Sequence, residues 1–247
     1  MNSTFYDRVA KIFGGYHSNI RIETECRAGD PEQVFLKKLL EHQRATANVL
    51  DVGCADGRFT ISVAPYFKSI TAIDASRGML AAARKNQHLD EVINVYFRYQ
   101  NLHTLKVKQR FNVVYCRRGP TDYPVFFQIL KSHGFYIEIN IGEHDAQLLK
   151  ETFGRGQNFG EWRSSFLSQT KRQLQYLGFT VLYARNFHCL EYYASYQDIE
   201  LFLRGVPIFE DFDSNKDRSH LKQYVVSHTN KRGIVLARHR YVLVARK

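Results

Sequence analysis

Apolar and polar positions change between the helix period and the strand period along the chain, most clearly between residues 30 and 86. Asp30 and Pro31 indicate a helix start, because Asp is a favoured N-cap and Pro fits the first helical position. Apolar residues then recur at helical spacing at Phe35, Leu36, Leu39 and Leu40. A strand follows at once, so the pattern predicts alternating helices and strands around a mostly parallel sheet covered on both faces.

The segments VLDVGCADGRFT (49–60) and ITAIDAS (70–76) describe a strand, a glycine turn, a helix and a second strand that ends in a carboxylate. Gly53 and Gly57 permit backbone conformations and close approaches that a Cβ would forbid. Asp74 lies about 20 residues beyond the first glycine, where such folds hold ribose hydroxyls. The two segments together predict a site for a nucleotide cofactor.

The spacing of the turn excludes two common cofactor classes. A dinucleotide site needs G-x-G-x-x-G, with a third glycine for tight packing of helix on strand. Positions 53, 55 and 58 are Gly, Ala and Arg, which argues against NAD and FAD. A G-x-x-x-x-G-K-S/T loop is also missing, which disfavours ATP chemistry.

The turn resembles motif I of the class I S-adenosylmethionine (SAM) methyltransferases, with Asp51, Gly53, Ala55 and Gly57 at the motif positions. Ala55 replaces the family's middle glycine, a departure that we expect to be mild because it adds one methyl group. The resemblance implies a Rossmann-like α/β fold: a doubly wound, seven-stranded, mostly parallel sheet with an antiparallel last strand. It implies SAM as the cofactor and no metal.

The resemblance extends along most of the chain, since residues 95–105, 110–116, 130–140, 177–187 and 238–247 are similar to the family's third to seventh strands. Asp74 would take the ribose hydroxyls, and Asn101 stands where the family usually has an Asp for the adenine amino group. An Asn still accepts a hydrogen bond there but carries no charge. The residues that the resemblance assigns to the cofactor are Asp51, Gly53, Cys54, Ala55, Gly57, Asp74, Ala75, Met79, Asn101, Leu102, Cys116 and Arg117.

Composition agrees with one domain over residues 1–247, because a chain that is 44% hydrophobic can bury a full core. The scattered cysteines form no CxxC pair, so we expect free thiols in a reducing, cytoplasmic compartment. No segment approaches the roughly 18 apolar residues of a membrane span. The four cysteines are Cys26, Cys54, Cys116 and Cys189.

Two segments outside the sheet are expected to select the acceptor. Residues 1–29 would form a lid over the cofactor, with His17 as a weak acceptor-binding candidate. The connection at about 190–231 begins where a strand opens onto the ligand crevice, which makes Tyr192 and Tyr193 candidate acceptor contacts. Packing of these two rings into the core is the alternative interpretation.

Residues after the fourth and fifth strands would face the transferred methyl group. Glu143 and His144 are the candidate general base or positioning groups, although local capping and solvation account for each of them as well. Arg118 suggests an acceptor carboxylate or phosphate, because a guanidinium matches either group. The alternative for Arg118 is an ion pair with Asp122 or Glu138. Arginines here also disfavour a divalent metal.

The sequence therefore predicts a SAM-dependent methyltransferase for a small or medium-sized, and in one reading anionic, acceptor. The net charge of +11 supports an rRNA or tRNA base methyltransferase as an alternative, since nine basic residues and one acidic residue follow Ser214. Against RNA, Arg238, Arg240 and Arg246 alternate with apolar residues as on the solvent side of an edge strand. A SAM-binding protein without catalysis is the second alternative, and the oligomeric state is open.

Overall fold

The computed structural model describes residues 3–16, 20–105 and 110–247. Within these residues one sheet has the strand order β1-β7-β9-β6-β5-β2-β3-β4, and β8 pairs with β9. β2 to β6 are parallel, whereas β9 is antiparallel to both β6 and β7. The strands are β1 (Ile22–Cys26), β2 (Arg44–Val52), β3 (Phe67–Asp74), β4 (Val95–Tyr99), β5 (Phe111–Arg117), β6 (Leu130–Ile141), β7 (Thr180–Tyr193), β8 (Thr229–Asn230) and β9 (Gly233–Arg246).

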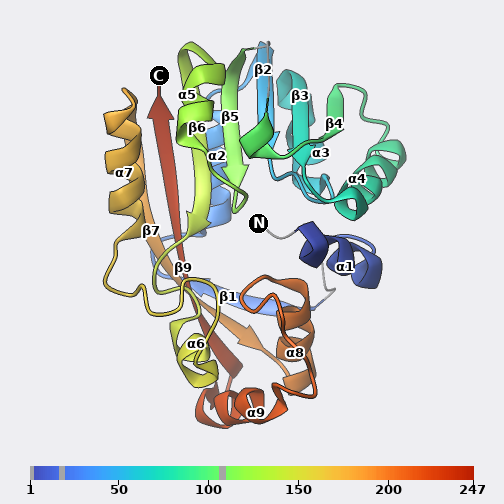
Figure 1. The fold of residues 1–247 in the computed structure, drawn as a ribbon, viewed down its shortest axis with the longest axis vertical. Helices are drawn as coiled ribbons and strands as arrows, with labels where there is room; N and C mark the ends of the chain where they lie inside the picture. The colour runs from blue at the N-terminus through green and yellow to red at the C-terminus, as the bar shows by residue number, and fades with distance from the viewer. Residues whose placement is uncertain (1–2, 17–19, 106–109) are drawn as a thin grey trace.

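This arrangement confirms the predicted mostly parallel α/β sheet with an antiparallel last strand (Figure 1). β1 extends the sheet at one edge, which the sequence pattern did not indicate. The helices and turns are α1 (Ser3–Phe13), α2 (Pro31–Leu40), α3 (Arg58–Val63), η1 (Ala64–Tyr66), α4 (Arg77–Leu89), η2 (Leu102–Thr104), α5 (Tyr123–Ile129), α6 (Gln147–Phe153), α7 (Phe166–Tyr176), α8 (Tyr196–Gly205) and α9 (Arg218–Ser227).

The N-cap expected at Asp30 is present, and Ser76 provides a second cap that was not predicted. The Asp30 carboxylate accepts a hydrogen bond from the Glu32 backbone N–H at 2.8 Å, and α2 begins at Pro31. The Ser76 hydroxyl likewise accepts from the Met79 N–H at 3.1 Å at the start of α4. Both caps satisfy backbone donors that the first helical turn leaves free. Local sequence therefore fixes where these two helices enter the layer beside the sheet.

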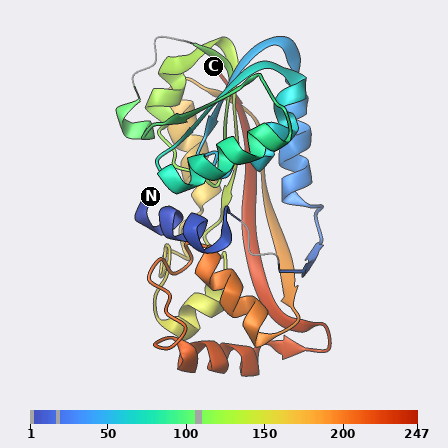
Figure 2. The same cartoon turned by 90° about the vertical axis from the view of Figure 1, so that its right-hand side faces the viewer.

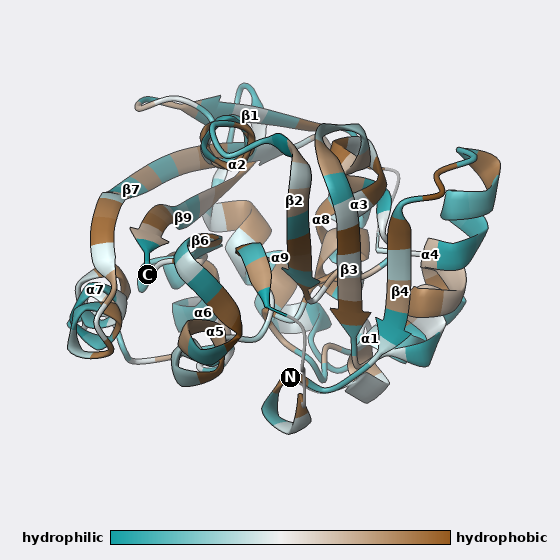
Figure 3. Ribbon diagram, turned by 90° about the horizontal axis from the view of Figure 1, so that it is seen from above, coloured by the Kyte–Doolittle hydropathy of each residue, from teal (hydrophilic) through white to brown (hydrophobic). Residues whose placement is uncertain are grey.

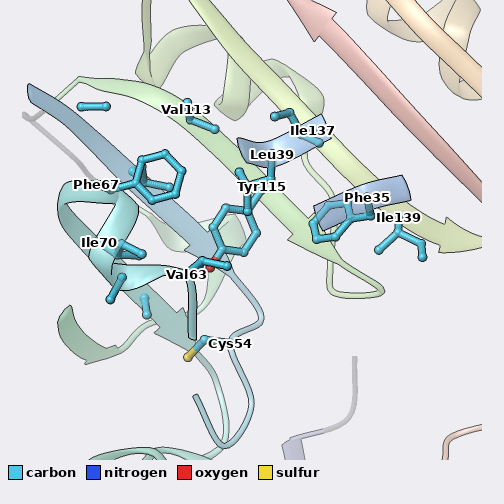
Figure 4. Packing of buried hydrophobic residues seen from close by; sticks show 14 of the residues in the cluster. Phe35, Leu39, Cys54, Val63, Phe67, Ile70, Val113, Tyr115, Ile137 and Ile139 are labelled. Atoms are coloured by element: carbon cyan, nitrogen blue, oxygen red, sulfur yellow. The ribbon is translucent and has the colours of Figure 1, made fainter. Parts of the chain in front are cut away.

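Apolar side chains on the two faces of the sheet form two separate core clusters. One face packs against α2, α3 and α4, and Figure 4 shows Phe35 of α2 beside Tyr115 of β5. The other face packs against α5 and α7, through residues such as Phe126 and Leu174. Seen from above in Figure 3, brown hydrophobic colour covers much of β2 and β3. These strands are buried on both faces, which explains their continuous apolar runs.

The strands β7 and β9 run beyond the parallel strands and carry a third apolar cluster with α6, α8 and α9 (Figures 1 and 2). Tyr193 and Leu236 from the extended ladder are fully buried in it, together with Leu203 of α8 and Leu221 of α9. The segment 190–231 thus finishes β7 and then folds over the end of the same ladder. Within the described part of the chain, no helix is long and apolar enough to cross a membrane.

Cys26 of β1 and Cys189 of β7 form a disulfide across the edge of the sheet. The expectation of four free thiols is therefore wrong for this pair, whereas Cys54 and Cys116 are free and buried. The two bonded cysteines are separated by 163 positions, so their spacing carried no sign of the pairing. The bond fixes the end of the N-terminal segment to the main sheet.

We expect reduction of this disulfide to lower the free energy of unfolding by about 2–4 kcal/mol, because the cross-link restricts a long loop of the unfolded chain. Urea unfolding with and without dithiothreitol measures the difference. The double variant Cys26→Ser/Cys189→Ser is the control and should not respond to the reductant. Titration of four free thiols in denatured, unreduced protein would contradict the assignment.

The turn between β2 and α3 holds three residues with positive φ: Gly53 (78°), Ala55 (48°) and Gly57 (71°). A Cβ on Gly57 would lie 2.5 Å from Phe97 Cζ, so glycine is required there by both space and conformation. Ala55 is strained because its methyl group is a Cβ, which makes the left-handed region unfavourable for an L-residue by roughly 1–2 kcal/mol. The replacement of glycine by Ala55 thus has a conformational cost that the sequence comparison did not indicate.

Substitutions at the two positions should have opposite effects on stability. Gly57→Ala should lower the free energy of unfolding by about 2 kcal/mol or more through overpacking and strain. Ala55→Gly should leave it unchanged or raise it by up to about 1 kcal/mol. Chemical denaturation of the matched pair measures both changes, and destabilisation by Ala55→Gly would contradict the strain argument.

Candidate functional site

A cavity of about 550 Å³ opens at the carboxyl ends of β2, β3 and β5. This is where open α/β sheets bind ligands, and the volume lies in the range of about 300–1,000 Å³ that is usual for small-molecule sites. Its walls come from the turn after β2, the end of β3, the loop after β4, the loop after β5 and the N-terminal segment. The lining residues used below are Tyr6, Tyr16, Asp51, Gly53, Cys54, Ala55, Asp56, Arg58, Asp74, Ala75, Asn101, Leu102, His103, Arg117 and Arg118.

Asp51 holds the turn after β2 in place through buried hydrogen bonds. One carboxylate oxygen accepts hydrogen bonds from the Thr60 hydroxyl at 2.6 Å and the Tyr115 hydroxyl at 2.8 Å. Burial raises the pKa of Asp51 to about 6, although both hydroxyls oppose the shift. These bonds connect β2, α3 and β5, so the turn is held in a fixed position at the cavity floor.

Asp74 ties the end of β3 to the same turn. Its Oδ2 accepts from the Ala55 N–H at 2.9 Å, and its Oδ1 accepts from the Ser76 N–H at 2.8 Å. Burial raises the pKa of Asp74, against the effect of these backbone donors. A carboxylate has about four acceptor positions, so two bonds leave capacity on both oxygens for a ligand. Asp74 can therefore accept from a vicinal diol while still bracing the turn.

The N-terminal segment lies at the rim of the cavity and is held there by two groups of hydrogen bonds. Asp7 Oδ1 in α1 accepts from the Ser76 hydroxyl at 2.6 Å and from the Gly78 N–H at 2.8 Å. Tyr16 donates its N–H to Asp56 Oδ2 at 2.8 Å, while its carbonyl accepts from Arg58 at 3.0 Å. Figures 1 and 2 show α1 between the parallel strands and α8. His17, the weak acceptor-binding candidate in this segment, lies outside the described residues.

The loop after β4 forms another wall. Asn101 Oδ1 accepts from the His103 N–H at 3.0 Å and so caps η2. This bond occupies one lone pair of the oxygen that would accept from an adenine amino group. The His103 ring lies with Nδ1 3.3 Å from Asp122 Oδ2, which links this loop to the one after β5. Leu102 is buried and supplies an apolar surface to the cavity.

Three residues assigned to the cofactor lie away from the cavity surface. Met79 is fully buried beneath α1, against Phe5 and Val9. Cys116 is fully buried, with its thiol 3.5 Å from the Pro120 carbonyl. Gly57 is the N-cap of α3 and acts through the shape of the turn. The other cofactor candidates all line the cavity.

The structure does not bring Glu143 and His144 to the cavity. Glu143 is buried, accepts from the Phe166 N–H at 3.2 Å and lies 4.0 Å from the His239 ring nitrogen. His144 Nδ1 contacts Gln147 Oε1 at 2.8 Å. Both residues follow β6, whose end turns toward α6 instead of the cavity. The local interpretation of each side chain therefore agrees with its surroundings.

Tyr192 and Tyr193 also lie outside the cavity. Tyr193 is fully buried, and its hydroxyl donates to Glu191 at 2.8 Å. The Tyr192 ring stacks with Arg232, whose guanidinium carbon is 3.8 Å from the ring centroid. β1 pairs with this part of β7, which places both rings within the extended ladder. The core-packing interpretation fits their positions, and the acceptor interpretation does not.

Arg117 and Arg118 line the cavity and share one carboxylate that the sequence did not indicate. Arg117 Nε donates to Glu32 Oε2 at 2.8 Å, and Arg118 Nη1 pairs with Glu32 Oε1. The expected alternatives for Arg118 are wrong, because Asp122 caps α5 and Glu138 bonds to Tyr136. Glu32 lies at the start of α2, which packs across the carboxyl end of β5 only in the folded chain.

The interpretation of the last strand as a solvated edge is wrong. β9 lies between β7 and β6, and Arg238 and Arg240 are 8% and 7% exposed. Arg238 Nε donates to Asp145 Oδ1 at 2.9 Å, and Arg240 Nη1 pairs with the same oxygen. Arg238 also donates to Glu191 at 2.8 Å. Charged residues alternate in this strand because buried carboxylates from outside the strand meet them.

Among the described residues, no group of three or more His, Cys, Asp or Glu side chains is placed to hold a metal ion. The cavity instead combines a carboxylate beside a backbone turn with an apolar wall and two arginines. A carboxylate that can accept hydrogen bonds from hydroxyls, a backbone turn that permits close approach and an apolar flank together suit a nucleoside with a charged substituent. The residues thus fit SAM.

Comparison with known proteins supports this interpretation. Residues 49–131 match the family described as "Methyltransferase domain". A 44-residue segment is 41% identical to the Saccharomyces cerevisiae protein named "Probable S-adenosylmethionine-dependent methyltransferase CRG1", covering 18% of this chain. The matched segment spans 15% of the length of that relative.

Solved structures share the fold over nearly the whole chain. A functionally unknown protein from Deinococcus radiodurans has a TM-score of 0.67 at 18% identity, covering 98% of both chains. A SAM-dependent methyltransferase from Geobacter sulfurreducens, in complex with S-adenosyl-L-homocysteine (SAH), has a TM-score of 0.60 at 13% identity. That match covers 98% of this chain and 97% of the other. Sheet order, glycine turn and the family match over residues 49–131 agree: the chain has the fold of the class I methyltransferases.

Proposed function

We propose that the chain transfers a methyl group from SAM to a small or medium-sized acceptor. The observation that carries the proposal is Asp74, which lines the cavity with free acceptor capacity while its carboxylate braces the Ala55 turn. In this assignment Asp74 accepts from the ribose hydroxyls. The Gly53–Ala55 backbone, which can approach a ligand closely, and the Leu102 side chain complete the cofactor contacts, and Arg117 borders the cofactor on the β5 side.

Bound SAM would supply a methyl group activated by its sulfonium, so the main task of the protein is alignment of the acceptor. Tyr6 and Tyr16 suit this task because they line the cavity from the lid, with ring centroids 5.8 Å apart. Burial raises the pKa of both hydroxyls, so they stay protonated and donate hydrogen bonds at neutral pH. Whether a proton must be removed depends on the acceptor atom, and Glu143 and His144 are not placed to do it.

The proposal favours a small acceptor over RNA because three of the nine basic residues after Ser214 are held in ion pairs within the fold. Arg238 and Arg240 are buried in ion pairs, and Arg232 pairs with Glu23 and Glu25. These arginines are not free to meet RNA phosphates. The lid across the cavity also favours an acceptor that enters the cavity over a folded RNA.

Loss of the Asp74 carboxylate should weaken SAM and SAH binding. Asp74→Asn removes charge-assisted hydrogen bonds worth about 1.5–3 kcal/mol, so the dissociation constant should rise roughly 10- to 100-fold. Isothermal titration calorimetry with each ligand measures the change. Asp90→Asn, at an exposed residue at the end of α4, is the matched control. Unchanged affinity in Asp74→Asn would remove the ribose assignment.

Transfer of labelled methyl groups from SAM identifies the acceptor class. Incubation of the protein with a small-molecule extract and, separately, with total RNA should label the extract alone. Label in RNA would favour the base methyltransferase alternative. Intact SAM binding with label in neither sample would favour a binding protein without catalysis.

A further inference from the structure

Four guanidinium groups and three carboxylates meet where the cavity borders the β7–β9 ladder. Arg117 and Arg118 share Glu32, and the two arginines of β9 pair with carboxylates from the neighbouring segments. Two carboxylates are therefore each shared by two arginines, and the group has an excess of positive charge. The members on the ladder side are Arg238, Arg240, Asp145 and Glu191.

On the ladder side of the group, further charges do not remove this excess, since the cavity carboxylates Asp51 and Asp56 act on Arg117 at the other end. Burial opposes ionisation of Asp145, but Arg238 and Arg240 outweigh it and hold the pKa of Asp145 well below its usual range. Lys150, 2% exposed, adds another positive charge near the same carboxylate. Asp145 therefore stays ionised but cannot neutralise every cation around it. A buried excess charge is costly unless a partner of opposite sign arrives.

Arg117 and Arg118 both line the cavity, and Arg118 is the one on which the β9 arginines act. Its φ of 57° lies in the left-handed region, a strained conformation for a residue with a Cβ and one that recurs at ligand-binding sites. Burial and the positive charge of Arg240 lower the pKa of Arg118 to about 10, so the side chain is still protonated at neutral pH. The backbone thus directs a charged guanidinium to the cavity wall.

The position of Arg118 separates it from the cofactor end. Arg118 follows β5 and Asp74 ends β3, and β2 lies between these strands. Two strand spacings of about 4.8 Å place the two backbones roughly 10 Å apart. Tyr16 lies near the cationic side, since Arg118, Arg238 and Arg240 all act on its hydroxyl. The charged wall therefore faces the acceptor half of the cavity.

From this geometry we infer that Arg118, supported by Arg240 and Arg238 behind it, binds a carboxylate or phosphate group of the acceptor. The Tyr16 hydroxyl is a further donor to the same anion. Asp145 is a positioning residue, because it holds the two β9 arginines in place and does not face the cavity. The inference rests on the proposed function in one respect only: it takes the bound anion to be part of the methyl acceptor.

Small anionic probes test the subsite without knowledge of the acceptor. Benzoate and inorganic phosphate are titrated into SAH-loaded protein at constant ionic strength and followed by NMR, with neutral benzamide as the comparison. We expect saturable millimolar binding of at least one anion, and binding of benzamide at least tenfold weaker than that of benzoate. Arg118→Gln should weaken anion binding at least tenfold, and Arg118→Lys less.

Arg246→Gln is the matched control, because Arg246 lies on β9 like Arg238 and Arg240 but is exposed. Both variants should bind SAH as the unsubstituted protein does, which separates a lost subsite from a lost fold. Equal binding of benzamide and benzoate, no binding of either anion, or unchanged anion binding in Arg118→Gln would overturn the inference. Failure to bind SAH would instead count against the proposed function, and the same titrations without SAH would still decide the subsite.

Discussion

The antiparallel pairing of β7 with β9 is the constraint on which the rest of the structure depends. Both strands are 14 residues long, and their ladder runs from Thr180 opposite Arg246 to Tyr193 opposite Ile234. One end of the ladder completes the sheet beside β6, and the other end supports α6, α8 and α9. A single hydrogen-bonded unit thus joins the parallel strands around the cavity to the helices α6, α8 and α9.

The same ladder explains the charges beside the cavity. Arg238 and Arg240 of the internal strand β9 are buried and pair with carboxylates from β7 and from the loop after β6. Buried ion pairs of this kind contribute little net stability, since desolvation offsets their attraction. Their consequence is positional: they hold Arg238 and Arg240 behind Arg118, where a cationic wall favours an anionic ligand.

The cofactor side depends on shorter connections. Asp51 and Asp74 support the glycine turn from two strands. The N-terminal segment contacts this turn where the Tyr16 N–H donates to Asp56, and it contacts the start of α4 where Asp7 accepts from Ser76 and Gly78. Ser76 also donates its N–H to Asp74, which connects the two contacts. The disulfide at Cys26 fixes the far end of the lid segment to the ladder, which couples the N-terminal segment to both halves of the molecule.

Local features were predicted correctly where neighbours in sequence are neighbours in space. The glycine turn, the cap at Asp30 and the acid at the end of β3 depend on contacts between residues that are close in the sequence. Their residue types and spacing are therefore visible in the chain, and they are enough to indicate the superfamily and its cofactor.

The tertiary structure alone decided which distant side chains meet. Arg238 and Asp145 are 93 positions apart, and Cys26 and Cys189 are 163 positions apart. A strand with alternating polar and apolar residues has the same sequence pattern at the edge and in the middle of a sheet. The alternation reflects the two faces of the sheet and carries no information about the neighbouring strands. Glu143, Tyr192 and Tyr193 were misplaced for a related reason: the direction in which a strand end turns is set by the packing beyond it. The sequence by itself determined the glycine turn and the acid at the end of β3, whereas the tertiary structure determined which side chains lie opposite them across the cavity.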